Sequence, residues 1–280
     1  MRIGETLLRI DRRVIYLILG IAVIAPLIKP IGIPVNVMPE TQKLFDAINQ
    51  IPSNDKPLLI SVDFDPAAMP ELYPMLLAIL RHAFAKNIRV LVLAIWAPGT
   101  GLGEMALQTV APEYNKTYGR DYVFLGYKPG MTAVMLGMGE SIRGVFPTDY
   151  YGTPLDSLEM MQPIRNYRDI AMCVSLSAGT PGYLEWISYA GARYGLKIGT
   201  GVTAVSAADA YPYVQTGQLC GLLAGLKGAS EYETLVERHG YSKAFKPACQ
   251  GMDSQSLAHL VMMIFIVLGN IGYFLTRRQR

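Results

Sequence analysis

Two long apolar segments lie at opposite ends of the 280-residue chain, and they limit what it can fold into. The first runs from Val14 to Ile28 and the second from Leu257 to Leu275. The second has no charged side chain over 19 residues, close to the ~20 residues that a helix needs to cross a bilayer. The first is shorter, but the long side chain of Lys29 behind it can reach the membrane interface. We therefore expect a transmembrane helix at each end.

Two alternatives to membrane anchors are disfavoured for these segments. A cleavable signal peptide is disfavoured because the best small-residue cleavage point, after Ala25, is followed by Pro26. A buried core helix does not explain the arginines outside the two segments. These are Arg2, Arg9, Arg12, Arg13, Arg277, Arg278 and Arg280. Basic residues beside membrane spans stay in the cytoplasm, so both termini are expected there.

The anchors divide the chain into three parts. Residues 1–30 form a cytoplasmic tail and the first anchor, residues 31–255 an extracytoplasmic domain, and residues 256–280 the second anchor and its tail. The middle part carries 17 basic and 20 acidic residues and is therefore negative, although the whole chain is +3. The expected partners are the lipid bilayer and other membrane-protein subunits, and the lack of a basic patch argues against nucleic acid.

The three cysteines do not form a metal-binding pattern. Cys173 lies in an apolar strand pattern, and neither Cys220 nor Cys249 has a neighbouring ligand at metal-binding spacing. A Cys220–Cys249 disulfide is one alternative in an oxidising compartment, and two buried thiols are the favoured one.

The middle of the chain alternates between strand-like and helix-like segments. Strands are expected at 57–64, 88–96, 121–127, 170–177 and 196–205, and helices at 70–86, 103–118, 132–143, 181–194 and 207–238. The strands are almost continuously apolar, as in a sheet covered on both faces. We predict an α/β fold: a Rossmann-like, doubly wound, mainly parallel five-stranded sheet, flanked by the two transmembrane helices. Residues 144–168 interrupt the alternation, and so long a connection is typical of a functional or interface element.

Ligands of such sheets bind outside the carboxyl ends of the strands. The residues expected in this cleft are Asp63, Asp65, Gly99, Gly101, Gly103, Ser175, Ser177 and Thr180. Asp63 and Asp65 are weak candidates for a Mg²⁺ or Ca²⁺ site, but no third ligand is evident, and we favour turn-capping roles for them. The glycine spacing places Glu104 where a dinucleotide-binding loop needs glycine, and this carboxylate would repel a pyrophosphate. Neither a metal nor a cofactor is predicted.

A catalytic triad is a disfavoured alternative. Ser177, Asp209 and His239 follow one another in the order found in α/β hydrolases. However, the residues around Ser177 lack the G-x-S-x-G turn that exposes the nucleophile in those enzymes.

Small residues recur at every fourth position near the end of the domain. Gly217, Gly221, Gly225 and Ala229 would form one side of the helix expected over 207–238. Each glycine inside a helix costs about 1 kcal/mol relative to alanine, so another backbone is expected to approach closely. The favoured neighbour is the domain's own sheet and an adjacent helix. A second copy or a partner subunit comes next, and membrane insertion is the weakest alternative.

Together these features predict a double-anchored membrane protein whose extracytoplasmic domain acts in assembly or ligand binding within a membrane complex, as a homo-oligomer. The alternative is a membrane-anchored hydrolase or metal-assisted enzyme that uses the cleft. An enzyme predicts that the polar groups of the cleft converge in one open pocket. If the domain is a scaffold, these polar groups should instead cap separate helices and turns. The glycine face or residues 144–168 should then be exposed in the monomer.

Overall fold

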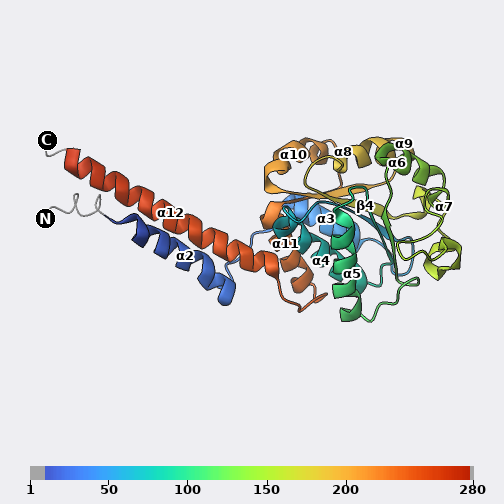
Figure 1. The fold of residues 1–280 in the computed structure, drawn as a ribbon, viewed down its shortest axis with the longest axis horizontal. Coiled ribbons are helices and arrows are strands. Elements are labelled where there is room, and N and C mark those ends of the chain that lie inside the picture. The colour runs from blue at the N-terminus through green and yellow to red at the C-terminus, as the bar shows by residue number, and fades with distance from the viewer. Residues whose placement is uncertain (1–9, 278–280) are drawn as a thin grey trace. The chain divides into compact units, whose positions relative to one another are not determined.

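A computed structural model describes residues 10–277, and they divide into two units (Figure 1). The described residues before Val35 and those from Cys249 onward form a helical unit, and Val35–Ala248 forms an α/β domain.

The α/β domain contains a six-stranded sheet in the order β3-β2-β1-β4-β5-β6, with every neighbouring pair parallel. Its strands are β1 (Leu58–Asp63), β2 (Val90–Ala94), β3 (Tyr122–Tyr127), β4 (Met172–Ser177), β5 (Ile198–Val202) and β6 (Leu222–Ala224). The predicted parallel α/β sheet is confirmed, but the predicted number of five strands is wrong.

Helices cover both faces of the sheet, as in a doubly wound fold. The α-helices of the domain are α3 (Pro39–Asn49), α4 (Met69–Ala85), α5 (Gly99–Glu113), α6 (Met131–Glu140), α7 (Ile142–Val145), α8 (Tyr183–Trp186), α9 (Ala192–Tyr194), α10 (Ala207–Gln215) and α11 (Gly225–Arg238). A π-helical segment, Ile187–Gly191, joins α8 to α9. Short 3₁₀ segments lie at Leu155–Ser157, Glu159–Met161, Tyr167–Asp169 and Ala204–Ser206.

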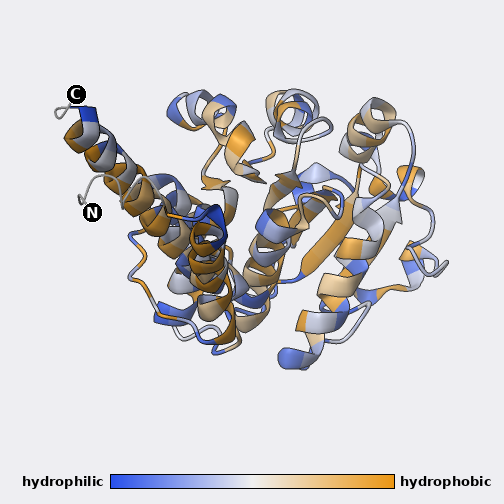
Figure 2. Cartoon of the chain, turned by 60° about the vertical axis from the view of Figure 1, so that its left-hand side comes forward, coloured by the Kyte–Doolittle hydropathy of each residue, from blue (hydrophilic) through white to orange (hydrophobic). Residues whose placement is uncertain are grey.

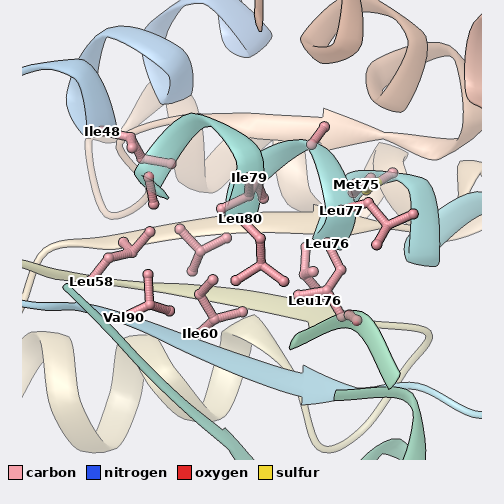
Figure 3. Packing of buried hydrophobic residues seen from close by; sticks show 14 of the residues in the cluster. Ile48, Leu58, Ile60, Met75, Leu76, Leu77, Ile79, Leu80, Val90 and Leu176 are labelled. Atoms are coloured by element: carbon pink, nitrogen blue, oxygen red, sulfur yellow. The ribbon is translucent and has the colours of Figure 1, made fainter. Parts of the chain in front are cut away.

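The hydrophobic core has two layers, one on each face of the sheet. In the first layer α3, α4, α5 and α11 pack on alternate strand residues such as Ile60 and Leu176 (Figure 3). In the second layer α6, α8 and α10 pack on the intervening residues, such as Leu59 and Cys173. Residues facing both layers are buried, which explains why the strands are almost continuously apolar in sequence.

The sixth strand lies inside the segment that the sequence predicted as one helix, and that prediction is wrong. Gly217 (φ +77°), just after the end of α10, and Gly225 (φ +58°), the first residue of α11, adopt left-handed backbone conformations. Between them Leu222 packs in the second layer and Leu223 in the first, the alternation of a strand covered on both faces. The segment is apolar all round because it is a buried strand, not a buried helix.

The residues that pack against the glycine series belong to the same chain. A Cβ atom on Gly221 would lie 2.4 Å from the backbone nitrogen of Leu44, and one on Gly225 would lie 2.7 Å from the Cβ of Ala204. Ala229 is fully buried in the first layer, and Gly217 faces open space. The four positions therefore do not form one helical face, and the close neighbours of Gly221 and Gly225 belong to the domain itself.

Residues 144–168 are packed against the domain. Seven of their side chains are buried in the second layer: Phe146, Leu155, Leu158, Met160, Met161, Ile164 and Tyr167. The segment is also held by buried Asp149, which accepts hydrogen bonds from the Tyr118 hydroxyl (2.6 Å) and from the backbone N–H of Thr153 (2.7 Å). Residues 144–168 therefore contribute to the second core layer.

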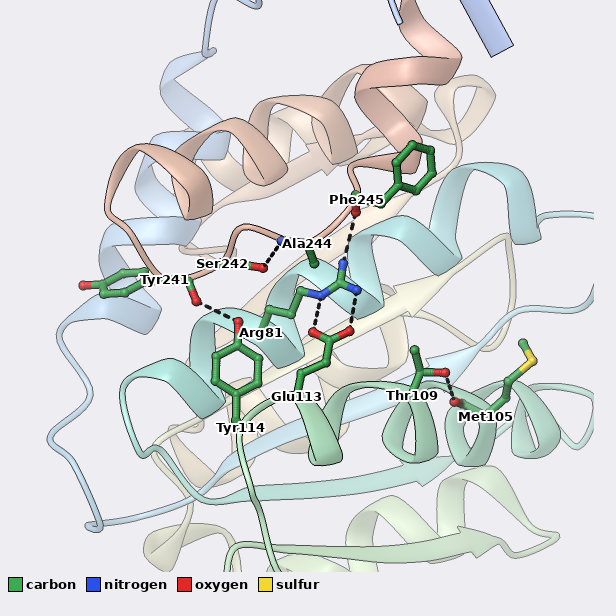
Figure 4. A network of polar contacts seen from close by, with 9 residues as sticks. All are labelled: Arg81, Met105, Thr109, Glu113, Tyr114, Tyr241, Ser242, Ala244 and Phe245. Carbon is green, nitrogen blue, oxygen red and sulfur yellow. Dashed lines mark hydrogen bonds and ion pairs between the residues drawn. The ribbon is translucent and has the colours of Figure 1, made fainter. Parts of the chain in front are cut away.

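A polar network fixes the last residues of the domain onto α4 and α5 (Figure 4). The Arg81 guanidinium donates two 2.8 Å hydrogen bonds to the carboxylate of Glu113, and a third bond reaches the Phe245 carbonyl. This pairing raises the pKa of the largely buried Arg81 above its usual value. The Tyr114 hydroxyl donates to the Tyr241 carbonyl (2.7 Å). The segment after α11 is thus held in place over α4 and α5.

The helical unit contains α2 (Arg12–Ile28) and α12 (Pro247–Arg277), both mostly hydrophobic (Figure 2). Among residues 10–277, α12 is the one helix that is long and apolar enough to cross a membrane. Helix α2 has 17 residues, fewer than the ~20 that a span requires, so the N-terminal anchor stays a prediction. Of the arginines expected in the cytoplasm, Arg2, Arg9, Arg278 and Arg280 lie outside the described residues.

Polar contacts tie the two ends of the helical unit together. The buried carboxylate of Asp253 on α12 accepts three backbone hydrogen bonds from residues 31–33, at 2.8 to 3.0 Å. Ser254 donates to the Val23 carbonyl (3.1 Å), and Gln250 donates to the Leu27 carbonyl (2.6 Å). The last carbonyls of a helix lack partners within the helix, and the bond from Gln250 supplies one for Leu27 at the end of α2.

Candidate functional site

The strand order reverses between β1 and β4, which makes this the switch point of the sheet. In open α/β sheets ligands bind outside the carboxyl ends of the strands at such a point. Strand β1 ends at Asp63 and β4 ends at Ser177, and these two residues are paired in the register of the sheet. The topology therefore brings together two residues that lie far apart in the chain.

Five buried residues at this position form what we call the switch-point cluster: Ser61, Asp63, Ser175, Ser177 and Trp186. The first four alternate along β1 and β4 with residues of the first core layer, so their side chains face the second layer. Trp186, the last residue of α8, lies in that second layer. None of the five is more than 3% exposed.

Asp63 is the one ionisable side chain of the cluster. Its Oδ2 accepts a hydrogen bond from the Ser61 hydroxyl (2.5 Å), and its Oδ1 accepts one from the Ile95 backbone N–H (2.7 Å). Burial raises the pKa of Asp63 to about 6, and hydrogen bonds, led by those from Ser61 and Ile95, limit the rise. The charged form of this carboxyl is therefore costly in the structure.

Three polar groups of the cluster have no hydrogen-bond partner. They are the hydroxyls of Ser175 and Ser177 and the indole N–H of Trp186. The Trp186 N–H lies close enough to Asp63 to lower the pKa of that carboxyl, but it does not form a hydrogen bond of normal geometry with it. Unpartnered polar groups are rare in protein interiors and cost about 1–3 kcal/mol each. Three of them lie beside the carboxyl of Asp63 in this cluster.

A glycine-rich loop covers the outer end of the cluster. Residues 178–180 are exposed, and a Cβ atom on Gly182 would lie 2.5 Å from the Ser177 Oγ. The π-helical segment after Trp186 is a feature that often occurs at functional sites. The cover of the cluster is therefore a short loop of small residues and an irregular helix.

The structure divides the predicted ligand cleft into two groups. Asp63, Ser175 and Ser177 converge in the cluster. Asp65 does not, because its Oδ1 accepts hydrogen bonds from the backbone N–H groups of Ala67 (3.0 Å) and Ala68 (3.3 Å) in the following turn. Thr180 lies in the exposed loop. A two-carboxylate metal site is therefore not assembled, and no group of three metal-ligating side chains occurs within the described part of the chain.

The glycines after β2 serve helix packing and not a phosphate loop. Helix α5 begins at Gly99, so Gly101 and Gly103 already belong to it. A Cβ atom on Gly99 would lie 1.9 Å from the Val62 carbonyl oxygen, and one on Gly103 would touch Phe124 at 3.4 Å. Gly99 and Gly103 allow α5 to lie close to the sheet on the first-layer face, whereas Gly101 faces open space.

The three residues of the candidate triad lie apart. Ser177 is buried on the second-layer face, whereas Asp209 is exposed on α10. His239 follows α11, where its ring is 4.7 Å from that of Phe45, a residue of the first layer. With serine and histidine on opposite faces of the sheet, the hydrolase arrangement is not formed.

Sequence reasoning missed Ser61 and Trp186 as members of the site. The pattern that could have revealed the cluster is the alternation of serine or aspartate with aliphatic residues in ISVD and VSLS. Two polar residues on the same face of each strand are unusual in a sheet covered on both sides.

A cavity of about 760 Å³ lies at the opposite, amino-terminal edge of the sheet. Its lining includes Arg89, Lys116 and Arg120, but each of these already donates to the protein. Their partners are the Asp55 carbonyl, the Asn87 side chain and the Asp121 carboxylate. This cavity offers charged groups that are paired, whereas the switch-point cluster offers buried groups that are not.

Comparisons with family models, with curated proteins and with solved structures found no match to this chain.

Proposed function

We propose that the chain is a double-anchored membrane protein whose α/β domain lies outside the cytoplasm and binds a small molecule at the switch-point cluster. The observation that carries the binding role is the set of unpartnered groups on Ser175, Ser177 and Trp186 beside Asp63. Their cost is explained if a ligand supplies the missing hydrogen bonds.

The surfaces of α2 and α12 support the double anchor. Both helices carry large apolar side chains that are exposed in the helical unit, among them Leu17, Ile24, Ile266 and Phe274. The least exposed positions of α2 are Ile15, Leu19, Gly20, Ala22 and Pro26, which follow a helical spacing. Helices that are apolar on their outer faces suit lipid, and the flanking arginines favour cytoplasmic termini.

Binding is favoured over catalysis because the cluster lacks the parts of a nucleophilic site. The hydroxyl of Ser177 has no base as a hydrogen-bond partner, and His239 lies on the other side of the sheet. Asp63 is the one group in the cluster that can exchange a proton near neutral pH.

Native mass spectrometry of the full chain after gentle extraction from membranes tests this proposal. We expect the wild-type protein to carry a small bound mass that is lost in both Asp63→Asn and Trp186→Phe. The matched control is Asp65→Asn, which removes a carboxylate from the same strand end but outside the cluster, and should retain the bound mass. A wild-type protein that shows only its own mass would contradict the proposal.

A role in assembly is a second candidate, favoured by exposed apolar side chains. Large ones occur at or after the carboxyl ends of four strands: Trp96, Tyr127, Leu184 and Val205. Of these four side chains Val205 is the most exposed, at 89%. The same mass measurement tests assembly. A wild-type oligomer that dissociates in Val205→Asp supports assembly through this edge of the sheet. A monomeric wild type excludes assembly through this edge.

A further inference from the structure

A cavity of about 120 Å³ lies beside β6, the strand at one edge of the sheet. Its walls come from α3 and the residue before it, from α10, from β6 and from α11. The lining residues include Glu40, Tyr211, Leu222, Ala224, Lys227 and Glu231. None of the lining residues belongs to the switch-point cluster, so this cavity is separate from the binding site proposed above.

The carboxylate of Glu231 in this cavity already has its partners. Glu231 is 1% exposed, and its Oε1 accepts a hydrogen bond from the ammonium of Lys227. Its Oε2 accepts from the Thr41 hydroxyl (2.5 Å) and from the Met38 backbone N–H (3.2 Å). The charges of Lys227 and Glu231 therefore compensate each other within the domain.

Glu40 lines the same cavity and lacks such partners. Its Oε2 atom is buried and has no hydrogen-bond partner among the residues that the structure describes, and no described ion pair includes Glu40. A glutamate in the first turn of α3 is favoured by the helix dipole, but the dipole does not supply a hydrogen bond to this oxygen. A buried acceptor without a donor is costly, so the cavity is short of one donor and one positive charge.

The remaining walls of the cavity are mostly apolar, and the space is small. Leu222 and Ala224 are two residues apart on β6 and so face the same side of the sheet, and the ring of Tyr211 comes from α10. An apolar protein cavity of ~150 Å³ accepts a six-carbon ring. A cavity of about 120 Å³ therefore has room for about five non-hydrogen atoms.

We infer that this cavity binds a short primary alkylamine in its ammonium form. The ammonium donates to the Glu40 Oε2 and neutralises this carboxylate, and the alkyl chain lies against Leu222, Ala224 and Tyr211. An ammonium group only donates, and its hydrogen bond to a carboxylate is stronger than that of a neutral donor. A ligand with a carboxylate would be repelled by Glu40, and an alcohol would supply a donor but no charge.

Methyl NMR of the full chain in detergent, with ¹³C-labelled methionine methyl groups, tests this inference because Met38 lines the cavity. The spectrum of Met38→Leu identifies the Met38 signal, and Met105, exposed on α5, reports effects of the probes outside the cavity. The probes are butylamine, butanol and butyrate near pH 7, which share a four-carbon chain. We expect a saturable shift of the Met38 signal with butylamine, at least about tenfold weaker binding of butanol, and no saturable shift with butyrate.

Two variants of α3 test the role of the Glu40 carboxylate. Glu40→Gln should weaken butylamine binding at least about tenfold, to the level of butanol, because the charge-assisted hydrogen bond is lost. The matched control is Asp46→Asn, which removes an exposed carboxylate of the same helix outside the cavity and should leave binding unchanged. Equal binding of butylamine by Glu40→Gln and the wild type, or equal binding of butanol and butylamine, would overturn the inference. The absence of a saturable Met38 shift with butylamine would overturn it as well.

Discussion

At the residue scale, the unpartnered hydroxyls make a prediction about stability that does not depend on the ligand. Ser177→Ala should raise the free energy of unfolding of the ligand-free chain by about 1 kcal/mol, because it removes a buried polar group that has no partner. The matched control is Thr200→Val, on the neighbouring strand β5. The buried Thr200 hydroxyl donates to the Ser175 carbonyl (2.9 Å), so its removal should lower stability by about the same amount.

Thermal unfolding followed by circular dichroism in detergent measures both changes. The two variants should move the midpoint in opposite directions. A loss of stability in Ser177→Ala as large as that in Thr200→Val would show that the Ser177 hydroxyl has a partner in the folded chain.

Two buried ionisable residues should make stability respond to pH with opposite signs. The pKa of Asp63 is raised from 3.8 to about 6, so the folded state binds this proton more tightly, and stability falls as pH rises from about 4 to 6. The pKa of His82 is lowered by burial from 6.5 to about 3, so the unfolded state binds its proton more tightly, and stability falls as pH drops below 6.5. Between pH 6 and 4 the two effects oppose each other.

Replacing either residue should leave the pH dependence of stability that the other residue contributes. In Asp63→Asn the loss of stability between pH 6 and pH 4 should be steeper than in the wild type, by up to ~3 kcal/mol for a shift of two pKa units. In His82→Gln the loss over the same range should be smaller than in the wild type. Chemical unfolding at pH 6, 5 and 4 provides the comparison, and parallel pH profiles for the wild type and Asp63→Asn would contradict a raised Asp63 pKa.

At the scale of elements, the sequence predicted most of the α/β alternation but not the division of the segment at 207–238. Residues 219–226 are apolar on every side, and a helix and a strand covered on both faces share this property. The deciding contacts are tertiary: the backbone of Leu44 on α3 lies against Gly221, and Gly225 lies against Ala204. Such contacts between distant parts of the chain leave no local periodicity in the sequence.

Gly221→Ala distinguishes the two interpretations of this segment. In a helix the change would stabilise the protein by up to about 1 kcal/mol. In the observed fold it should destabilise the protein by about 1–3 kcal/mol, because the new Cβ atom would lie 2.4 Å from the Leu44 backbone nitrogen. Gly101→Ala is the control, since Gly101 lies inside α5 and faces open space, so this change should raise the thermal midpoint. A higher midpoint for Gly221→Ala would contradict the strand.

At the scale of the whole molecule, the sequence predicted the edge of the sheet that carries the site but not the site itself. The carboxyl ends of the strands follow from the α/β alternation, and Asp63, Ser175 and Ser177 were expected there. The order of the strands determines which of these residues converge. Strand β4 lies next to β1, and β2 and β3 lie on the other side of β1. That order also decides that Trp186 covers Asp63, and it cannot be obtained from local patterns.

The proposed topology places the α/β domain outside the cytoplasm. A cysteine introduced at Lys43, an exposed residue of α3, should react with a membrane-impermeant maleimide in intact cells, beyond the reaction of the parent chain. A cysteine introduced at Glu5, in the N-terminal tail, should react only after the cells are permeabilised. The reverse pattern would place the domain in the cytoplasm, and labelling of both positions in intact cells would exclude a double anchor.

The central claim is that a bound molecule completes the hydrogen bonds of the switch-point cluster. The most direct test is an experimental density map, at a resolution that shows ordered water, of the chain purified gently from its native membranes. We predict density larger than a water molecule at about 3 Å from both the Ser177 Oγ and the Trp186 Nε1, with the Asp63 carboxyl on its other side. A map in which these atoms bond only to protein groups or to a single water molecule would contradict the claim.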